Sequence, residues 1–418
     1  MTLPRLLLVF ALALPAPLSA TALADCLDDQ EMPRVARILG SDGSPQFVLV
    51  VAQEEGRPTR VSPLAPEGTP LAEVFRLAAA RSQQSSLTGS EVLAETELAT
   101  RVCSPVSVPQ PSLDAEQSVI VAAGLNYAAH AEEAGGGDVM LFPKAVEPTG
   151  PYDRVAPPEG VALLDWEVEL GLVLVEAVHL DAPPDEESLL EQAAYFVTND
   201  VSDREPIIRE KALTGPGTGF VKAKAQPGFL PAGPWMVRGR ELGAALFACA
   251  SAGMGLHLDV DEGAGPTRRQ EATTGQMILD PLELLARLRE QVEREGRHSP
   301  MAIERSGTPK HYPLALESGE GVGPWLPAGT VLLTGTPEGV ALTAPSIGPV
   351  LLRGLLRLRG PLEQFRIEER ERAAAGAPGG YLQEGDVVHA AIDGLGAQRW
   401  RVAAAGSPAP RDPCRAPR

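Results

Sequence analysis

Residues 163–174 read LLDWEVELGLVL, an apolar run interrupted by acidic residues, and this stretch is the most informative in the chain. The run predicts a buried strand, and strand side chains alternate between the two faces of a sheet. Glu167 and Glu169 must therefore point the same way, on a face that continues into small and apolar residues. Two such carboxylates are unfavourable unless they are paired or bind a cation, and a hard divalent cation would satisfy both. An ordinary exposed acidic face is the alternative interpretation.

A second strand that ends in an acid follows at residues 195–200, YFVTND. If this strand neighbours the first, Asp200 supplies a third carboxylate from a separate strand end. The alternative is a simple turn in which Asn199 and Asp200 hydrogen-bond to the local backbone. Together the two strands predict a metal site made of Glu167, Glu169 and Asp200.

A histidine and a glutamate stand at helical spacing after another strand-like run, SVIVAA. The residues that follow, 124–133, read GLNYAAHAEE. In a helix that opens after Asn126, His130 and Glu133 are three residues apart and share a face. A carboxylate beside an imidazole fixes its tautomer and raises its basicity, as a water-activating base requires. A surface His–Glu pair is the alternative.

Composition restricts the classes of partner. The chain has 418 residues, 44% hydrophobic and 22% charged, which is ordinary for a globular protein with a sizeable core. Its net charge of −19 argues against nucleic acid and anionic membrane surfaces as partners. No stretch after the N-terminus reaches about 20 apolar residues, so we expect no membrane span. A small anionic substrate is compatible with this charge, because a bound cation reverses the local field.

The N-terminus has the pattern of an export signal. Arg5 precedes the apolar run LLLVFALAL, and residues 22–24 form an A-x-A cleavage motif. Residues 1–24 are therefore predicted to be a signal peptide that leaves Asp25 first in the mature chain, exported to a bacterial periplasm. Acylation of Cys26 in a lipoprotein is the alternative.

Four cysteines suit an oxidising compartment, and their spacing matches no zinc pattern. They are Cys26, Cys103, Cys249 and Cys414. We expect two disulfides, and the natural first guess is Cys26–Cys103 to close the N-terminal region and Cys249–Cys414 to hold the tail. The sequence leaves all three pairings open.

The sequence pattern changes along the chain and indicates two domains. Residues 25–112 alternate short apolar runs with Gly/Pro turns and predict a small β-rich domain. Residues 113–405 contain many short strands and few helices, which predicts a mainly β catalytic domain and an α+β fold. Two segments inside it read as insertions, about 294–325 and about 341–380, and the charged run in the second predicts a helix. Residues 406–418 form a Pro/Arg-rich tail.

Eight segments in order resemble the fumarylacetoacetate hydrolase (FAH) family over roughly residues 119–403, apart from the two insertions. The most specific are DWEVEL together with NDVSDR, and the strand TVLLTGTPEGV. The others include GLNYAAHAEE, LFPK, KAQPGFLPAGPW, RQEATTGQMI and LQEGDVVHAAIDGLG. The resemblance implies a mixed β-roll catalytic fold, usually dimeric, with a Mg²⁺, Mn²⁺ or Ca²⁺ site.

By position in these motifs, residues of this chain resemble the functional residues of the family. The metal carboxylates are Glu167, Glu169 and Asp200, the water-activating pair is His130 and Glu133, the active-site lysine is Lys224, and the substrate contacts are Thr336 with Tyr127 and Arg204. One departure concerns the loop after this lysine, where Pro227 and Gly228 stand in place of an acidic K-x-x-D-T-F run.

The implied activity is hydrolysis of a C–C bond in a small 2,4-dioxo acid, such as an acylpyruvate, through a metal-bound enolate. Decarboxylation or isomerisation of a related oxo-diacid stabilises the same enolate, so both are alternatives. The presence of His130 together with Glu133 favours hydrolysis. A non-catalytic periplasmic binder of metal-chelated dicarboxylates is an alternative of another class. A homodimer is the expected assembly.

Overall fold

A computed structural model describes residues 20–415, with gaps. The gaps fall at residues 85–86, 88, 107–119, 215–218, 296–297, 304–308, 312–314, 319–320, 346–349, 351–352, 354, 358–359 and 377. Most of the predicted signal peptide, residues 1–19, therefore lies outside the described residues. Helix α1 (Ala20–Asp28) runs through the predicted cleavage site.

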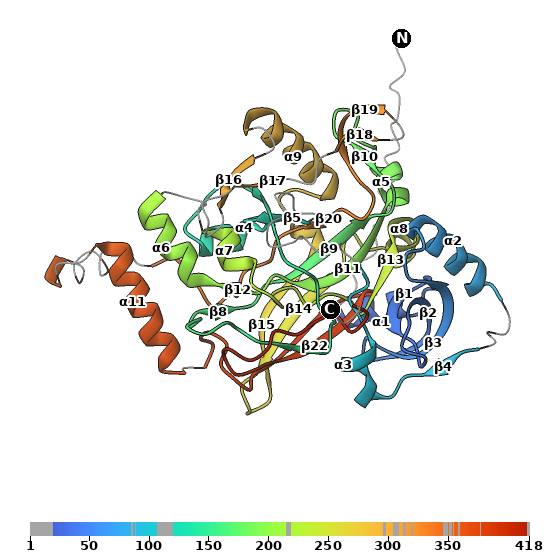
Figure 1. Cartoon of the computed structure of the whole chain (residues 1–418), viewed down its shortest axis with the longest axis horizontal. Coiled ribbons are helices and arrows are strands. Elements are labelled where there is room, and N and C mark those ends of the chain that lie inside the picture. The colour runs from blue at the N-terminus through green and yellow to red at the C-terminus, as the bar shows by residue number, and fades with distance from the viewer. Residues whose placement is uncertain are drawn as a thin grey trace, which may run out of the picture.

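The centre of the molecule is a ten-stranded mixed sheet (Figure 1). In spatial order its strands are β4 (Glu91–Val92), β3 (Arg57–Pro66), β2 (Pro45–Glu54), β1 (Val35–Leu39), β13 (Trp235–Arg238), β11 (Ala193–Asn199), β9 (Val168–Leu174), β20 (Val331–Leu333), β5 (Ile120–Gly124) and β6 (Met140–Pro143). Neighbouring strands are antiparallel except for β20 and β5, which are parallel. Every residue of β9 and β11 is buried, because the central strands are covered on both faces.

A five-stranded sheet packs against the middle of the main sheet. Its strands, in order, are β15 (Pro266–Thr273), β14 (Gly255–Asp261), β21 (Val387–Ile392), β22 (Gly396–Val402) and β7 (Arg154–Val155). Strands β14, β21 and β22 contact β9 or β11, and the apolar core between the sheets includes the fully buried Trp166, Trp235 and Trp400. Packed sheets built mainly from antiparallel pairs confirm the predicted α+β, mainly β fold.

Short ribbons and helices surround the two sheets. The ribbons pair β19 (Gly321–Leu326) with β10 (Val178–His179) and β18 (Ala315–Ser318), β12 (Ser202–Asp203) with β8 (Leu164–Asp165), and β16 (His298–Ile303) with β17 (Pro309–His311). The helices are α2 (Leu71–Ser82), α3 (Leu98–Arg101), α4 (Ala128–Glu133), α5 (Glu186–Gln192), α6 (Arg204–Thr214), α7 (Phe220–Lys224), α8 (Gly239–Ala248), α9 (Pro281–Glu295) and α11 (Pro361–Ala374), with 3₁₀ turns η1 (Glu95–Glu97) and η2 (Thr274–Gln276). Within the described part of the chain, none of these helices is both long and apolar enough to cross a bilayer.

The N-terminal strands belong to the same sheet as the strands of the predicted catalytic domain. β1 pairs with β13 through Val35–Met236 and Ala36–Trp235, and α2 packs over β2 and β3. A division of the chain at residue 112 stays a prediction, which folding of the separated segments would test.

Two disulfides are present, as expected, but the first-guess pairing is wrong. Cys26 is bonded to Cys249, and Cys103 is bonded to Cys414. The physical reason is the topology, because α1 packs against β14 and so lies close to the end of α8. Sequence proximity cannot show this contact, since 223 residues separate the two cysteines.

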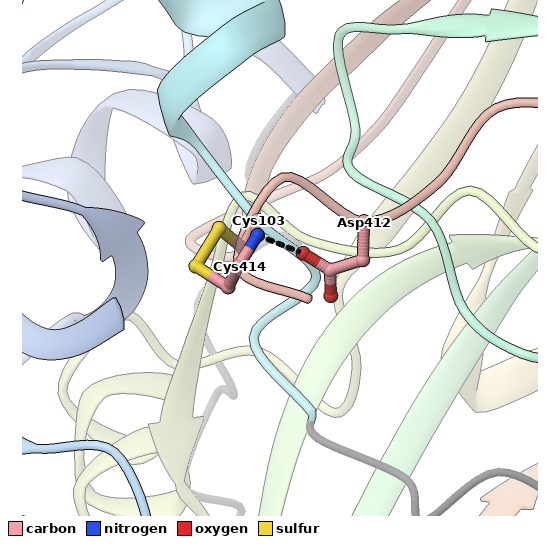
Figure 2. A group of neighbouring side chains, drawn as sticks. All are labelled: Cys103, Asp412 and Cys414. Atoms are coloured by element: carbon pink, nitrogen blue, oxygen red, sulfur yellow. Dashed lines mark hydrogen bonds between the residues drawn. A yellow bond between two sulfur atoms is a disulfide. The ribbon is translucent and has the colours of Figure 1, made fainter. Parts of the chain in front are cut away.

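The C-terminal tail is attached to the N-terminal strands. The Arg37 guanidinium of β1 forms a buried ion pair with Asp412 at 2.7 Å, and the backbone N–H of Cys103 donates to the Arg37 carbonyl. Asp412 also accepts from the backbone N–H of Cys414, next to the disulfide (Figure 2). The C-terminal tail is therefore fixed beside β1.

The second predicted insertion contains the expected helix, α11, which lies beside α6 at one side of the molecule (Figure 1). Proline at its first position suits a helix start, because its missing N–H would have no partner there. The first predicted insertion contributes the short strands β16 to β19, and the segments between them lie largely outside the described residues.

Candidate active site

The pairing of two strands brings the three predicted carboxylates together. Glu167 directly precedes β9 and Glu169 lies within it, while Asp200 directly follows β11. Antiparallel pairing places Thr198 opposite Glu169, so the start of β9 meets the end of β11. The Asp200 N–H donates to the Glu167 carbonyl at 2.8 Å. Carboxylate oxygens of the three acids lie within 4.8 Å of one another, and all three residues are buried.

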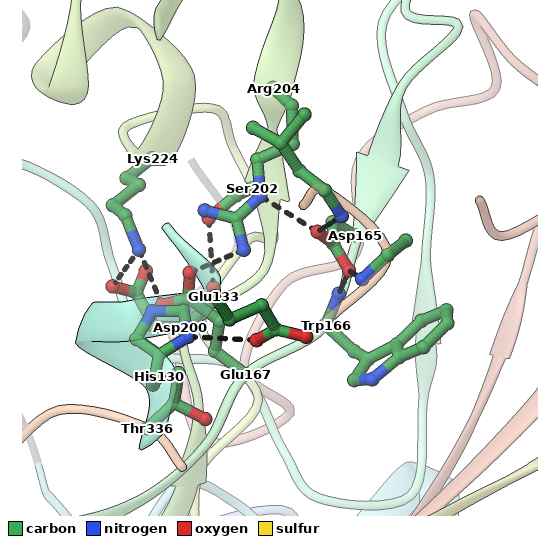
Figure 3. A network of polar contacts seen from close by, with 12 residues as sticks. His130, Glu133, Asp165, Trp166, Glu167, Asp200, Ser202, Arg204, Lys224 and Thr336 are labelled. Carbon is green, nitrogen blue, oxygen red and sulfur yellow. Dashed lines mark hydrogen bonds and ion pairs between the residues drawn. The ribbon is translucent and has the colours of Figure 1, made fainter. Parts of the chain in front are cut away.

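Three cationic side chains surround this cluster, and Figure 3 shows two of them, Lys224 and Arg204. Lys224 Nζ lies 2.5 Å from Glu167 Oε2 and 2.7 Å from Asp200 Oδ2, and Arg204 Nη2 lies 2.6 Å from Glu167 Oε1. Lys144 forms an ion pair with the other oxygen of Asp200. Burial opposes ionisation of Glu167, but the charges of Lys224 and Arg204 outweigh it and hold the pKa of Glu167 at about 2.

Glu169 is in the opposite electrostatic situation. Its Oε2 accepts a hydrogen bond from the Gly335 N–H at 3.0 Å, whereas its Oε1 is buried with no hydrogen-bond partner in the described part of the chain. Burial and the negative charges of Asp200 and Glu167 raise the pKa of Glu169 well above its ordinary value. A buried, unsatisfied carboxylate oxygen of this kind is suited to a cation that approaches from the cluster.

The predicted histidine–glutamate pair is formed on α4. His130 Nδ1 lies 3.2 Å from Glu133 Oε2, and His130 is only 8% exposed. The same oxygen of Glu133 also accepts from the Gly339 N–H at 3.2 Å, which helps to hold the carboxylate in place. The helix after Asn126 is therefore confirmed, and the loop after β20 holds its glutamate in place.

Glycine is required at position 339 for this contact. Gly339 has a φ of +97°, in the left-handed region that other residues rarely adopt. A Cβ atom at this position would lie 1.9 Å from the carbonyl oxygen of Arg269. A side chain here would force the loop to move and would displace the N–H that binds Glu133.

A cavity of about 540 Å³ opens beside the cluster. Its polar lining includes His130, Glu167, Arg204, Lys224 and Thr336, so five of the predicted site residues face one space. Glu169 and Asp200 lie behind this surface and are fully buried.

Two of the predicted substrate contacts, Thr336 and Tyr127, do not present a free hydroxyl to the cavity. The Thr336 hydroxyl donates to the Val168 carbonyl at 2.9 Å and accepts from Gln270 at 2.8 Å, so it is already engaged although it lines the cavity. Tyr127 is 2% exposed and does not line the cavity, and its hydroxyl has no hydrogen-bond partner among the described residues. Burial, with the charge of Glu169, raises its pKa. Their roles in substrate binding stay predictions.

Sequence reasoning assigned no role to three residues that organise the site. The Asp165 carboxylate accepts from Arg204 Nε at 2.8 Å and from the backbone N–H groups of Ala341 and Leu342. Gln270 bridges the Val168 N–H to the TGTP loop. Lys144 joins Asp200 to the carbonyls of Lys224, at the end of α7, and of Phe229. For Asp165 a signal existed, because it shares the strand parity of the two predicted glutamates.

The carboxylate cluster, the histidine pair and the two packed sheets can now be compared with known proteins. Residues 119–403 match the sequence model of the fumarylacetoacetate (FAA) hydrolase C-terminal family. The chain belongs to the FAH family. Members of the FAH family commonly depend on a divalent metal, and the acidic cluster of this chain could bind one.

Related proteins within the FAH family include both hydrolases and isomerases. The chain is 29% identical over 287 residues to a 2,4-didehydro-3-deoxy-L-rhamnonate hydrolase of Sphingomonas sp. strain SKA58, covering 68% of this chain and 72% of that protein. A solved structure of fumarylacetoacetate hydrolase from Exiguobacterium antarcticum is 22% identical, with a TM-score of 0.53, covering 89% of this chain and 99% of that one. A 2-hydroxyhepta-2,4-diene-1,7-dioate isomerase from Mycobacterium marinum is 19% identical, with a TM-score of 0.50, covering 90% and 100%. These structures share the fold.

Proposed function

We propose that this FAH-family chain is a divalent-cation-dependent hydrolase that cleaves a C–C bond of a small 2,4-dioxo acid of the acylpyruvate type. The proposal is carried by the position of His130, which is held by Glu133 and lines the same cavity as Glu167 and Lys224. Hydrolysis needs a base that activates water beside the substrate, whereas decarboxylation and isomerisation do not.

The carboxylate cluster fits a divalent cation. Glu167, Glu169 and Asp200 offer oxygens within 4.8 Å of one another, and one oxygen of Glu169 has no partner among the described residues. Oxygen ligands suit Mg²⁺, Mn²⁺ or Ca²⁺, and we favour Mg²⁺ because it binds through few carboxylates and leaves positions for water and substrate. When bound, the cation supplies positive charge that orients an oxo acid and stabilises negative charge developing on it.

The residues of the chain perform the remaining steps. Because Glu133 holds Nδ1 of His130, Nε2 is the nitrogen that takes a proton from water. The resulting hydroxide adds to the C4 carbonyl of the dioxo acid, and the C3–C4 bond then breaks. The electron pair stays on C3 as the enolate of pyruvate, and the other fragment leaves as a carboxylic acid. The Lys224 ammonium stabilises the enolate charge, and protonated His130 returns its proton to C3.

Loss of the enol absorbance of acetylpyruvate, measured with and without EDTA and Mg²⁺, tests this function. We expect turnover that EDTA abolishes and Mg²⁺ restores, with pyruvate and acetate as products. His130→Gln and Glu133→Gln should each lower kcat by about 10²- to 10⁴-fold, the usual contribution of a general base. A parental rate in His130→Gln would contradict the water-activating role.

The products also separate the alternatives. Release of CO₂ from oxaloacetate, or isomerisation of an unsaturated oxo-diacid, in place of acylpyruvate cleavage would identify a decarboxylase or an isomerase. Thermal stabilisation by oxalate with no turnover of any oxo acid would identify a non-catalytic binder.

We further propose that the chain is exported to the periplasm and acts as a homodimer. The two disulfides support an oxidising compartment. Cleavage after residue 24 would shorten α1 but would keep Cys26 in its disulfide. Mass spectrometry of the protein from periplasmic extracts should find Asp25 at the N-terminus, and light scattering should give twice the chain mass.

A further inference from the structure

The lining of the active-site cavity is of two kinds. Charged and polar groups come from α4, the strand ends and α7, as described above. The remainder is largely apolar, and its members include Leu125, Met140, Ile208, Phe220, Leu362 and Phe365. The cavity volume of about 540 Å³ falls within the roughly 300–1,000 Å³ of pockets that enclose drug-sized ligands. This volume is larger than a five-carbon oxo acid needs.

Part of the apolar wall is supplied by α11, which lies in the segment 341–380 that the family motifs of this chain do not cover. Leu362 and Phe365 stand three residues apart and so share one face of α11, and both line the cavity. Phe365 is 7% exposed and packs within the main apolar core, while Leu362 is half-buried. A substrate group in the cavity would therefore contact α11 directly.

Helix α11 is held in place by ion pairs and a hydrogen bond further along the helix. Glu205 of α6 accepts from Arg366 at 2.6 Å and from Arg370 at 2.8 Å. Within α11, the Glu369 carboxylate accepts from the Tyr381 hydroxyl at 2.6 Å. The ion pairs fix α11 against α6, so Leu362 is held in place as part of the cavity wall.

The charged residues of the lining that lie outside the catalytic group are Lys211 and Asp138, and both are exposed. They carry opposite charges, and neither is desolvated by its surroundings. Outside the catalytic group, a terminal carboxylate on the substrate could pair only with Lys211, at an exposed site where such pairs contribute little. The buried part of the wall is apolar, which favours an apolar substituent.

We infer that the substrate of this chain is a 2,4-dioxo acid with a bulky apolar acyl group, and that Leu362 and Phe365 of α11 determine this preference. The inference rests on the proposed function and goes further, because it specifies which acyl groups are taken. Each buried methylene should raise kcat/KM by about 3- to 4-fold, the effect of transferring one CH₂ from water into an apolar site.

The test compares acetyl-, butanoyl- and hexanoylpyruvate with an acylpyruvate of hexanoyl length that ends in a carboxylate. We expect kcat/KM to rise along the alkyl series and to fall at least tenfold for the carboxylate-ended compound. Leu362→Ala should flatten the rise, and Leu362→Lys should shift the preference toward the carboxylate-ended compound. Ile367→Ala is the matched control, because Ile367 is a half-buried residue of the same helix that does not line the cavity.

Several results would overturn the inference while leaving the hydrolase proposal intact. One is a kcat/KM that does not rise with alkyl length. Another is a preference for the carboxylate-ended substrate that is lost in Lys211→Met. A third is a Leu362→Ala substrate profile equal to that of Ile367→Ala. If no acylpyruvate is cleaved, the hydrolase proposal fails, and binding decides the inference. Calorimetry with Mg²⁺ and pyruvate, 2-oxohexanoate or 2-oxooctanoate should show affinity rising with length, and equal affinities would refute it.

Discussion

Replacing Lys144 with methionine should destabilise the protein strongly, although this residue does not line the candidate active-site cavity. The Lys144 ammonium is 1% exposed, pairs with Asp200, and donates to the carbonyls of Lys224 at 2.7 Å and Phe229 at 3.2 Å. Methionine fills a similar volume but leaves a buried carboxylate oxygen and two carbonyls without these donors. Removing one partner of a buried ion pair costs about 3–5 kcal/mol of unfolding free energy.

The assay is urea unfolding in EDTA, followed by tryptophan fluorescence, so that no added cation can compensate for the lost ammonium. Lys222→Met is the matched control, because Lys222 is two residues from Lys224, is 20% exposed and forms a 3.4 Å ion pair with Glu210. This longer, partly exposed pair should contribute less than the buried one, about 1 kcal/mol. If Lys144→Met lies within 1 kcal/mol of the parent, the buried network does not stabilise the site as described.

Three further predictions follow from the same geometry. Burial raises the pKa of Asp203 to about 6, so the parent loses stability as pH rises from about 4 through 6. Asp203→Asn should therefore be more stable than the parent by about 2–3 kcal/mol at pH 7 but not at pH 3.5. Equal curves of unfolding free energy against pH for the two proteins would contradict this. Gly339→Ala should lower kcat at least tenfold because it displaces the N–H that holds Glu133, and a normal rate with a normal melting temperature would disprove that coupling. Cys103→Ser with Cys414→Ser should reduce the unfolding free energy by up to about 5 kcal/mol, since that disulfide closes a very long loop of 311 residues, and an unchanged urea midpoint would count against a structural role for the tail.

Local patterns were sufficient to predict much of the site. Alternation along a strand placed Glu167 and Glu169 on one face, and helical spacing joined His130 to Glu133, because both depend only on residues close in sequence. The position of Asp200 at a strand end was also readable, although its neighbour strand had to be assumed.

Contacts between distant segments could not be predicted in the same way. Lys144 meets Asp200 only because β6, β11 and the end of α7 converge, and no local period encodes that meeting. The disulfide partner of Cys26 depends on where α1 packs, which the cysteine spacing leaves open. Membership of β1 in the main sheet likewise depends on its pairing with β13, in which Val35 lies opposite Met236, 201 residues later in sequence.

The site also differs from a simple acidic patch in its balance of charge. Lys224 and Arg204 neutralise Glu167, whereas at Glu169 burial and the charges of Asp200 and Glu167 outweigh the attraction of Lys224, and the carboxylate accepts from one backbone N–H. This asymmetry makes Glu169 the residue whose environment most requires a cation. Its replacement is therefore the most direct probe of the cluster.

Isothermal titration of the EDTA-treated protein with Mn²⁺, for the parent and for Glu169→Gln, measures whether the three carboxylates share one cation. The account predicts one Mn²⁺ per chain for the parent and binding at least tenfold weaker for Glu169→Gln. An unchanged stoichiometry and affinity in the variant, or a parent that binds no divalent ion, would contradict it.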